Sequence, residues 1–486
     1  MSHNWEINLR KHREMTEIFS ADGWLNTAIT YINNVLWTYV LVAVLIACAV
    51  LFTIKTHGVQ FRMIGEMIRL LGDSTKKTHE KHVSSFEAFA VSIASRVGTG
   101  NLAGVATAIA VGGPGAIFWM WVIALLGSAT AFVESTLAQL YKRKTKGSYI
   151  GGPAYYMMFG LHKRWMARLY AVLITVTFCM AYISIQSNTI CGAMRGAFGV
   201  QPWVMGLILV ALSTACVFGG INRIAKVSSI FVPVMAVLYI LLALVILAMN
   251  IQLVPRMFAL IIENAFGFRQ FTGGTFGVMM MTGIKSGLFS NEAGEGSAAC
   301  AASIADVSHP VKQGLVQALS VFTDTLLICS CTAFVILLSG VYTDNSLNGI
   351  QLTQNALQHE IGTAGPTFVA VAIFMFAFSS IIGNYTYGEM NVKFLTTDRR
   401  WLTFVRVMNG IVMVLFGALA SLDLVWNLGD LFMGCITLCN LFAIVKLHPR
   451  AVFLLKDYIR QKRAGIKSPT FHKSQMPEIA DELSAW

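Results

Sequence analysis

Two glycines and an amide interrupt an apolar stretch of the chain at residues 96–101, which read RVGTGN. A glycine weakens a helix by about 1 kcal/mol relative to alanine. Irregular backbone at membrane depth is tolerated only where protein encloses it or where it lines a cavity. An unwound segment there would offer amide groups to an anion and carbonyl oxygens to a cation. Close helix packing through small residues is the alternative, but the adjacent Arg96 and Asn101 favour a binding site.

A second interruption is expected at residues 281–287, MTGIKSG, which again contains two glycines and a single cation, Lys285. Matching interruptions in two halves of a membrane protein point to a binding site. Lys285 could instead extend its ammonium to the membrane surface. Buried cations need partners, because each costs at least about 2.5 to 3.5 kcal/mol near the membrane centre. The candidate partners are Glu87, Glu134, Asp324 and Glu389.

Two further positions offer polar groups inside apolar segments. Ser379 and Ser380 are adjacent hydroxyls with no charge nearby, and hard cations take oxygen ligands. Serines in such helices also commonly bond back to their own helix carbonyls. Gln186 is an amide that could bind a solute or hold two helices together.

Signals of catalysis are weak. The GEGS sequence at residues 294–297 lacks the final glycine and the strand-turn-helix setting of a nucleophile elbow. There is no phosphate-binding loop, and no nucleophile, base and orienting group can be nominated. We therefore expect no enzyme, no catalytic residue and no organic cofactor.

The elements that position these residues must be membrane helices. Of 486 residues, 56% are hydrophobic and 12% are charged, against about 25% charged in soluble proteins. The lipid bilayer is therefore the expected surroundings of the chain. The net charge of +12 is carried by short basic runs between apolar segments. This pattern indicates positive-inside topology rather than a nucleic-acid partner.

A spanning helix needs about 20 residues. Eleven spans are predicted, which makes an all-α polytopic protein with its N-terminus outside and its C-terminus in the cytoplasm, in the cytoplasmic (inner) cell membrane. The predicted spans are residues 30–54, 86–111, 115–140, 167–194, 203–220, 228–250, 273–290, 314–340, 365–392, 402–421 and 426–446.

Ten of these spans divide into two sets of five that enter the membrane in opposite directions, at residues 86–250 and 273–446. Inverted repeats of this kind are typical of secondary transporters. Residues 1–85 form the N-terminus, an extra span and a basic loop, residues 251–272 an external connector, and residues 447–486 a basic cytoplasmic tail.

Several motifs resemble the alanine or glycine:cation symporter family over about residues 30–450. They are GTGNLAGVA at 98–106, GGPGAIFWMW at 112–121, GGP at 151–153, FSNEAG at 289–294 and FSS at 378–380. The resemblance implies a LeuT-like 5+5 inverted repeat with one extra N-terminal helix. It also implies Na⁺-coupled, or sometimes H⁺-coupled, uptake of small neutral amino acids such as alanine and glycine, and it implies no particular oligomeric state.

The resemblance also implies two ligand sites. The substrate-binding residues would be Gly98, Thr99, Gly100, Asn101, Gln186, Thr282, Gly283, Ser380 and Asn384. The Na⁺ ligands would be the carbonyls of Ala94, Val97 and Phe376 and the hydroxyls of Ser379 and Ser380.

Two residues depart from the family members with the best-known pocket. Asn384 stands where a tryptophan closes that pocket, so the expected solutes extend to a longer polar amino acid such as glutamine. Arg96 stands where a small hydroxyl residue occurs, which favours a single coupling ion. The alternative functions are H⁺-coupled symport and, less favoured, a solute-gated cation channel.

Overall fold

The computed structural model describes residues 20, 22–74, 83–145, 148–217, 220–266, 275–344 and 346–486, with no side chains described for 217 and 220–232. The predicted external N-terminus up to residue 19 and the connector from residue 267 to 272 lie outside the described residues.

Seven helices of the described residues are long and apolar enough to cross a membrane, which indicates a multi-pass membrane protein. They cover Trp24–Lys55, Ala116–Leu140, Arg164–Phe198, Pro310–Ser339, Ala364–Leu395, Arg399–Leu419 and Leu422–Arg463. An eighth results if Pro233–Met249 and Val254–Phe266, which are bent by 102° to each other, count as one span. The other predicted spans, 86–111, 203–220 and 273–290, coincide with shorter or interrupted helices.

In the first half of the chain, the elements up to the small sheet are α2 (Trp24–Leu36), α3 (Val42–Lys55), α4 (Val59–Arg62), α5 (Ile64–Ser74), α6 (Ser85–Arg96), α7 (Val105–Gly112), α8 (Ala116–Leu140), β1 (Arg143–Thr145) and β2 (Ser148–Ile150). After the sheet come α9 (Pro153–Tyr155), α10 (Arg164–Val176), α11 (Tyr182–Phe198), α12 (Pro202–Val217), α13 (Gly220–Met249) and α14 (Val254–Phe266). The two strands pair antiparallel, with Arg143 opposite Ile150. π-helical turns join neighbouring helices at Trp37–Leu41, Gly100–Gly104, Tyr156–Gly160 and Thr177–Ala181.

The second half contains α16 (Thr275–Asn291), α17 (Ser297–Ser303), α18 (Pro310–Val321), α19 (Ser330–Ser339), α20 (Gly349–Ile361), α21 (Ala364–Leu395), α22 (Arg399–Val414) and α23 (Leu422–Arg463). Further π-helical segments lie at Phe322–Cys329, here called η5, and at Leu415–Leu419. Short 3₁₀ turns cover Val341–Thr343, Lys473–Gln475 and Pro477–Glu482.

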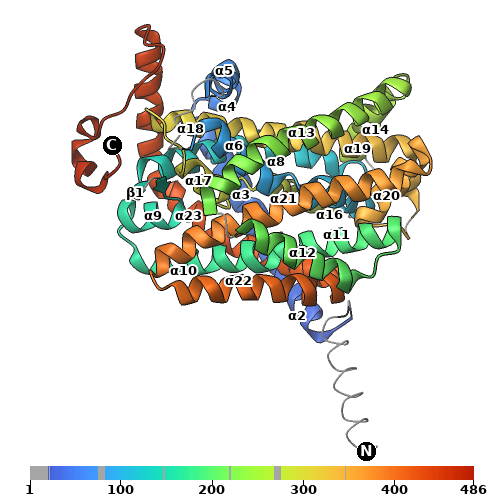
Figure 1. Cartoon of the computed structure of the whole chain (residues 1–486). Coiled ribbons are helices and arrows are strands. Elements are labelled where there is room, and N and C mark those ends of the chain that lie inside the picture. The colour runs from blue at the N-terminus through green and yellow to red at the C-terminus, as the bar shows by residue number, and fades with distance from the viewer. Residues whose placement is uncertain are drawn as a thin grey trace, which may run out of the picture.

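The helix α21 is central to the arrangement that positions the candidate site. It packs against α6, α11, α13 and α20 and crosses the middle of the bundle in Figure 1. Nearly all of its residues from Phe376 to Val392 are buried. The face that carries Ser379, Ser380 and Asn384 therefore meets other helices rather than lipid.

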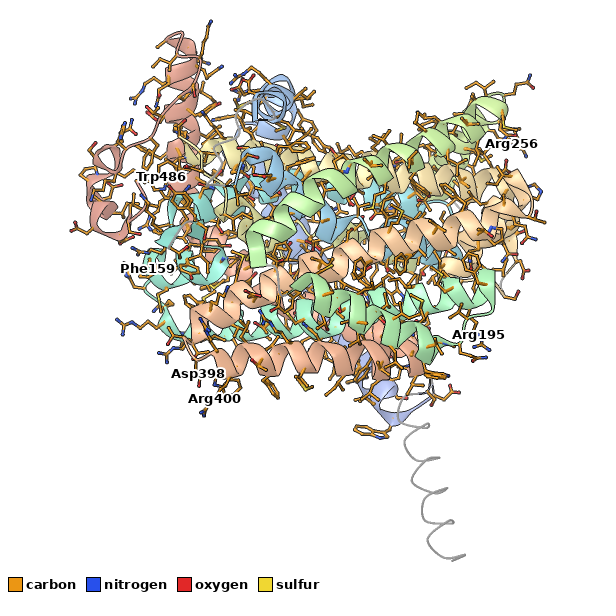
Figure 2. The ribbon with its side chains drawn as sticks, in the orientation of Figure 1. Phe159, Arg195, Arg256, Asp398, Arg400 and Trp486 are labelled. Carbon is orange, nitrogen blue, oxygen red and sulfur yellow. The ribbon has the colours of Figure 1, made fainter. Side chains whose placement is uncertain are left out.

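Charged side chains mark the two ends of the bundle. Figure 2 shows Asp398 and Arg400 at one end and Arg195 and Arg256 at the opposite end. The outward-facing surfaces of α12, α13 and α22 between these ends carry exposed Leu, Ile, Val and Trp side chains. An apolar belt between charged ends is the surface that a bilayer requires.

Candidate functional site

The predicted interruption after Arg96 is confirmed. Helix α6 begins with a capping box, in which the Ser84 hydroxyl accepts from the Glu87 amide and the Glu87 carboxylate accepts from the Ser84 amide. It ends at Arg96, and Val97 leaves the helical region with ψ of 89°. Helical structure resumes only as the π turn at Gly100–Gly104. We call residues 97–99 the first break.

Two side-chain amides satisfy the backbone groups that this break releases. The Gly98 amide donates to Asn101 Oδ1 over 3.0 Å. The Thr99 amide and hydroxyl both donate to Gln186 Oε1, over 3.0 and 2.7 Å. The Gln186 oxygen thus accepts the hydrogen bonds that a bound anionic group would otherwise accept.

Glycine at position 98 lets the first break approach the side chains of Ser380 and Gln186 closely. A Cβ there would collide with the Ser380 hydroxyl and would lie 2.9 Å from Gln186 Oε1. At Gly100 a Cβ would lie 3.1 Å from a ring carbon of Phe289 on α16. The first break is thus enclosed by α11, α16 and α21.

The five predicted Na⁺ ligands are brought together between the end of α6 and the middle of α21. Ser379 Oγ lies 3.3 Å from the Ala94 carbonyl and 2.8 Å from that of Phe376. Ser380 Oγ lies 3.4 Å from the Val97 carbonyl and 3.1 Å from that of Phe376. The cluster consists of neutral oxygen atoms inside the protein, which is a donor set suited to a hard cation.

Asn101 links the first break to η5. Its amide nitrogen donates to Asp324 Oδ1 over 2.7 Å, and Ser290 donates to Asp324 Oδ2 over 2.5 Å. Asp324 was predicted only as a partner for a buried cation. Asn101 holds the break in place, because its Oδ1 accepts from the Gly98 amide while its Nδ2 donates to Asp324.

Asn384 lies four residues after Ser380 on α21, and its Oδ1 accepts from Ser95 Oγ over 2.6 Å. Its Nδ2 is buried and has no hydrogen-bond partner among the described residues. Asn384 therefore retains one free donor near the end of α6.

The expected interruption at residues 281–287 is wrong. Helix α16 runs without a break from Thr275 to Asn291. A Cβ at Gly283 would collide with the Ala116 carbonyl, and one at Gly287 would lie 2.5 Å from Ile123 Cγ2. These glycines let α16 approach α8 closely. Thr282 packs against Gly112, so Thr282 and Gly283 lie apart from the first break.

The interruption in this half of the chain instead lies at residues 292–296, between α16 and α17, and we call it the second break. Glu292, Gly294 and Gly296 all have positive φ, at 52°, 98° and 93°. Glycine accepts such angles without strain. The pair of glycines on either side of Glu295 was the available signal for this break.

Buried Arg96 and half-buried Lys285 have acidic partners that the sequence did not indicate. Arg96 Nε lies 4.0 Å from Glu292 Oε2, and Lys285 Nζ lies 2.9 Å from Asp430 Oδ2. Glu389, one of the candidates, pairs with Lys393 at 2.6 Å. Arg96 thus connects the end of α6 to the second break.

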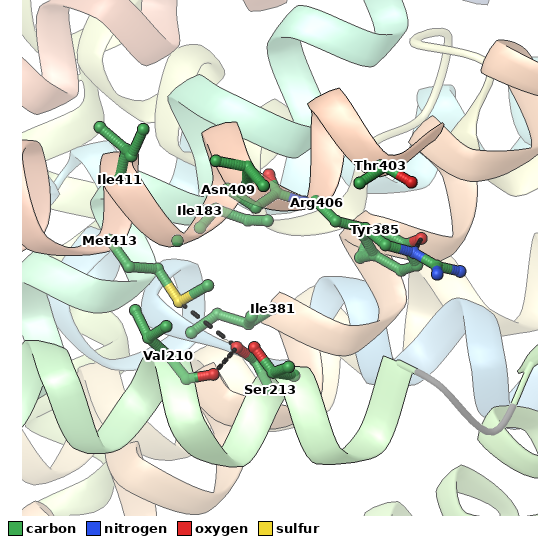
Figure 3. A pocket seen from close by; sticks show the side chains of 13 residues that line it. Ile183, Val210, Ser213, Ile381, Tyr385, Thr403, Arg406, Asn409, Ile411 and Met413 are labelled. Atoms are coloured by element: carbon green, nitrogen blue, oxygen red, sulfur yellow. Dashed lines mark hydrogen bonds between the residues drawn. The ribbon is translucent and has the colours of Figure 1, made fainter. Parts of the chain in front are cut away.

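A cavity of about 460 Å³ lies between α11, α12, α21 and α22. Figure 3 shows Ile183, Ile381 and Met413 around it and the hydroxyl of Ser213 bonded to its own helix. Its lining is mainly apolar and contains none of the predicted substrate or Na⁺ residues. The first break is therefore the better candidate site for the carboxylate and ammonium groups of an amino acid.

Known proteins resemble this chain along nearly its whole length. The model of the sodium:alanine symporter family matches residues 22–473. The probable sodium/glutamine symporter GlnT of Bacillus subtilis is 49% identical over 91% of this chain and 92% of that protein. The amino-acid carrier protein AlsT of the same organism is 48% identical over 94% and 97%. The sodium/alanine symporter AgcS of Methanococcus maripaludis is 35% identical over 89% and 97%. The chain is therefore a transporter rather than an enzyme, and it belongs to the sodium:alanine symporter family.

Proposed function

We propose that this protein is a secondary active symporter in the cytoplasmic membrane, which imports a small neutral amino acid together with Na⁺. The observation that carries the proposal is the gathering of five oxygen atoms between α6 and α21, directly beside the first break. The two broken helices each begin one of the predicted five-helix sets, which supports the inverted repeat at 86–250 and 273–446.

The mechanism follows from the position of the proposed Na⁺ site. A cation there would replace the hydrogen bonds that Ser379 and Ser380 now donate and would join α6 to α21. This would hold the first break in the form that binds the amino-acid carboxylate, with the Gln186 oxygen displaced. Each ligand then raises the affinity of the other by the same factor. One Na⁺ moving inward gains about 2.3 kcal/mol per 100 mV, which drives uptake of a neutral solute.

Uptake of labelled alanine and glutamine into proteoliposomes tests the ion. With Na⁺ outside we expect concentrative uptake, and with choline in its place we expect none. Ser380→Ala should raise the Na⁺ concentration for half-maximal uptake by about tenfold or more, the scale of one lost contact to a charge. The matched control is Ser213→Ala, which removes a hydroxyl bonded only within the apolar cavity region. Uptake that continues in choline would overturn Na⁺ coupling.

The solute is proposed to include glutamine. The free amide nitrogen of Asn384 would donate to the side-chain oxygen of glutamine, and the relative named as a sodium/glutamine symporter supports this choice. We expect unlabelled glutamine to compete with labelled alanine. Asn384→Trp should remove that competition while alanine uptake continues. Absence of competition by excess glutamine in the unmodified protein would contradict the assignment.

Proton coupling is the second candidate, because a relative from Bacillus sp. PS3, 38% identical, is named a sodium/proton-dependent alanine carrier protein. Uptake in choline that a protonophore abolishes would favour it. Saturable countertransport in the same vesicles would distinguish either carrier from a solute-gated channel.

A further inference from the structure

The second break gathers more acidic groups than its surroundings can neutralise. Glu292 and Glu295 belong to the break, Glu134 comes from α8, and Arg96 ends α6. All four side chains are at most 2% exposed. A single guanidinium therefore faces three buried carboxyl groups.

Two of the carboxyl groups accept hydrogen bonds at both oxygens. Glu292 Oε2 accepts from Ser297 over 2.5 Å, with the Arg96 guanidinium beside it, and its Oε1 lies 2.9 Å from the Ser95 hydroxyl, whose single hydrogen it shares with Asn384 Oδ1. Glu134 accepts from the Gly294 amide over 3.4 Å and from Asn440 Nδ2 over 2.8 Å. These hydrogen bonds offset part of the cost of burying an ionised carboxylate.

Glu295 differs from both. Its Oε2 accepts from the Tyr182 hydroxyl over 2.9 Å, but its Oε1 is buried without a hydrogen-bond partner among the described residues. Among the residues that the structure describes, Nε and Nη2 of Arg96 also have no hydrogen-bond partner. The ion pair of Arg96 is with Glu292, so in the part of the chain that the structure describes Glu295 forms no ion pair of its own.

An isolated buried carboxylate is strongly disfavoured, and the group takes up a proton instead. We propose that Glu295 is a proton-binding residue of the carrier, protonated at Oε1 in this conformation. This inference rests on the proposed transport function. When the second break moves during transport and water reaches the group, the O–H bond breaks, the proton passes to water, and the carboxylate remains. The reverse step restores the neutral acid.

The site is connected to the proposed substrate site through one hydroxyl. Ser95 Oγ lies 2.9 Å from Glu292 Oε1 and 2.6 Å from Asn384 Oδ1. In addition, the Tyr170 hydroxyl donates to the Glu295 carbonyl over 2.6 Å. A solute that moves Asn384 therefore changes the hydrogen bonds of the carboxyl cluster, so solute and proton occupancy are linked.

The titratable groups that face Glu295 come from α6, α8, α10, α11 and the break itself. They are Arg96, Glu134, Tyr170, Tyr182 and Glu292. Their acidic members outnumber the one cation, so together they favour the neutral form of Glu295.

Uptake as a function of pH tests the proposal. We would measure Na⁺-driven uptake of labelled alanine or glutamine at equal internal and external pH, from about pH 6 to about pH 9, where buried carboxyl groups titrate. Wild-type uptake should fall with rising pH, approaching about tenfold per unit above the midpoint. In Glu295→Gln, which is permanently neutral, uptake should change by less than about twofold over the same range. Glu389→Gln removes a carboxyl paired with Lys393 and should keep the wild-type profile. A wild-type profile in Glu295→Gln would overturn the proposal.

Infrared spectroscopy of the purified protein provides a measurement that does not need transport. The carbonyl band of a protonated carboxyl group should be present in the wild type and in Glu389→Gln at neutral pH, and it should lose intensity in Glu295→Gln. An unchanged band would overturn the proposal even if the variant carried no solute. A lost band together with uptake that ignores Na⁺ would instead contradict only the proposed function.

Discussion

At the scale of single residues, Gln186 determines what the first break can accept. Its side-chain oxygen accepts both the amide and the hydroxyl hydrogen bonds of Thr99. An amino-acid carboxylate needs the same donors, because backbone amides freed at a helix interruption are what binds an anion. Solute binding must therefore move Gln186. The hydrogen-bond donors of Thr99 then have an acceptor both with and without solute.

Gly98→Ala should abolish uptake. The added methyl group would collide with Ser380 and crowd Gln186, so the first break and the Na⁺ ligands could not both keep their positions. The measurement is Na⁺-driven uptake at matched protein levels in proteoliposomes.

Gly277→Ala is the control for this change. It makes the same substitution in α16, where no atom of the described residues lies within 4 Å of the new methyl group, and alanine favours a helix by about 1 kcal/mol. Normal uptake by Gly98→Ala would show that the contact between α6 and α21 is not needed for transport.

At the scale of the elements, glycine serves two purposes that a sequence pattern does not separate. Gly283 and Gly287 lie in a continuous helix and allow α16 to pack on α8. Gly294 and Gly296 have positive φ and end that helix at the second break. The first purpose depends on a neighbouring helix and the second on backbone angles. Each segment contains two glycines, so the sequence pattern alone does not show which pair interrupts the helix.

Gly294→Ala should destabilise the second break. Its φ of 98° disfavours any side chain, at a cost of about 1 to 2 kcal/mol, and a new methyl group would lie only 3.2 Å from Leu441 Cδ2, which must give way. We expect a lower melting temperature in detergent and slower uptake.

Gly340→Ala is the matched control, because Gly340 has a φ of 71° at the end of α19, and no atom in the described part of the chain lies within 4 Å of a new Cβ there. It should lose similar stability and keep its rate of uptake. Equal uptake by both variants would contradict a role of the second break in transport.

At the scale of the whole molecule, the tail after α23 folds back on the bundle. The Phe471 amide donates to the Ser308 carbonyl over 2.8 Å, and Trp486 Nε1 donates to the Gln139 carbonyl over 3.0 Å. The Phe471 ring also packs on His309, which caps α18. The tail thus contacts the segment between α17 and α18, which is separated from the second break only by the short helix α17.

This contact should depend on pH through His309. Burial lowers the pKa of His309 to about 4, and the hydrogen bond with Asp457 offsets only part of that effect. An exposed histidine has a pKa of about 6.5. The neutral ring accepts from the Val311 amide through Nδ1, and protonation would break this bond. Docking is therefore complete above about pH 6.5 and weakens as the pH falls toward about 4.

Hydrogen exchange of residues 466–475, corrected for intrinsic rates, measures the weakening of docking as a loss of amide protection at low pH. His309→Asn keeps an acceptor for the cap of α18 and does not titrate, so its protection should be constant over the same range. Protection that falls equally in both proteins would contradict the assignment to His309.

Local sequence properties are enough to indicate a helical membrane protein and a break in α6 at residues 97–99, and the family resemblance indicated which five oxygens gather beside that break. Apolar length, glycines within an apolar stretch and adjacent serines are local properties, and the family motifs carried the rest. Three features follow from the tertiary contacts alone: Gly283 is a packing residue, Asn101 binds Asp324 and Arg96 faces Glu292. These outcomes depend on which side chains distant segments bring together, and spacing along the chain does not contain that information.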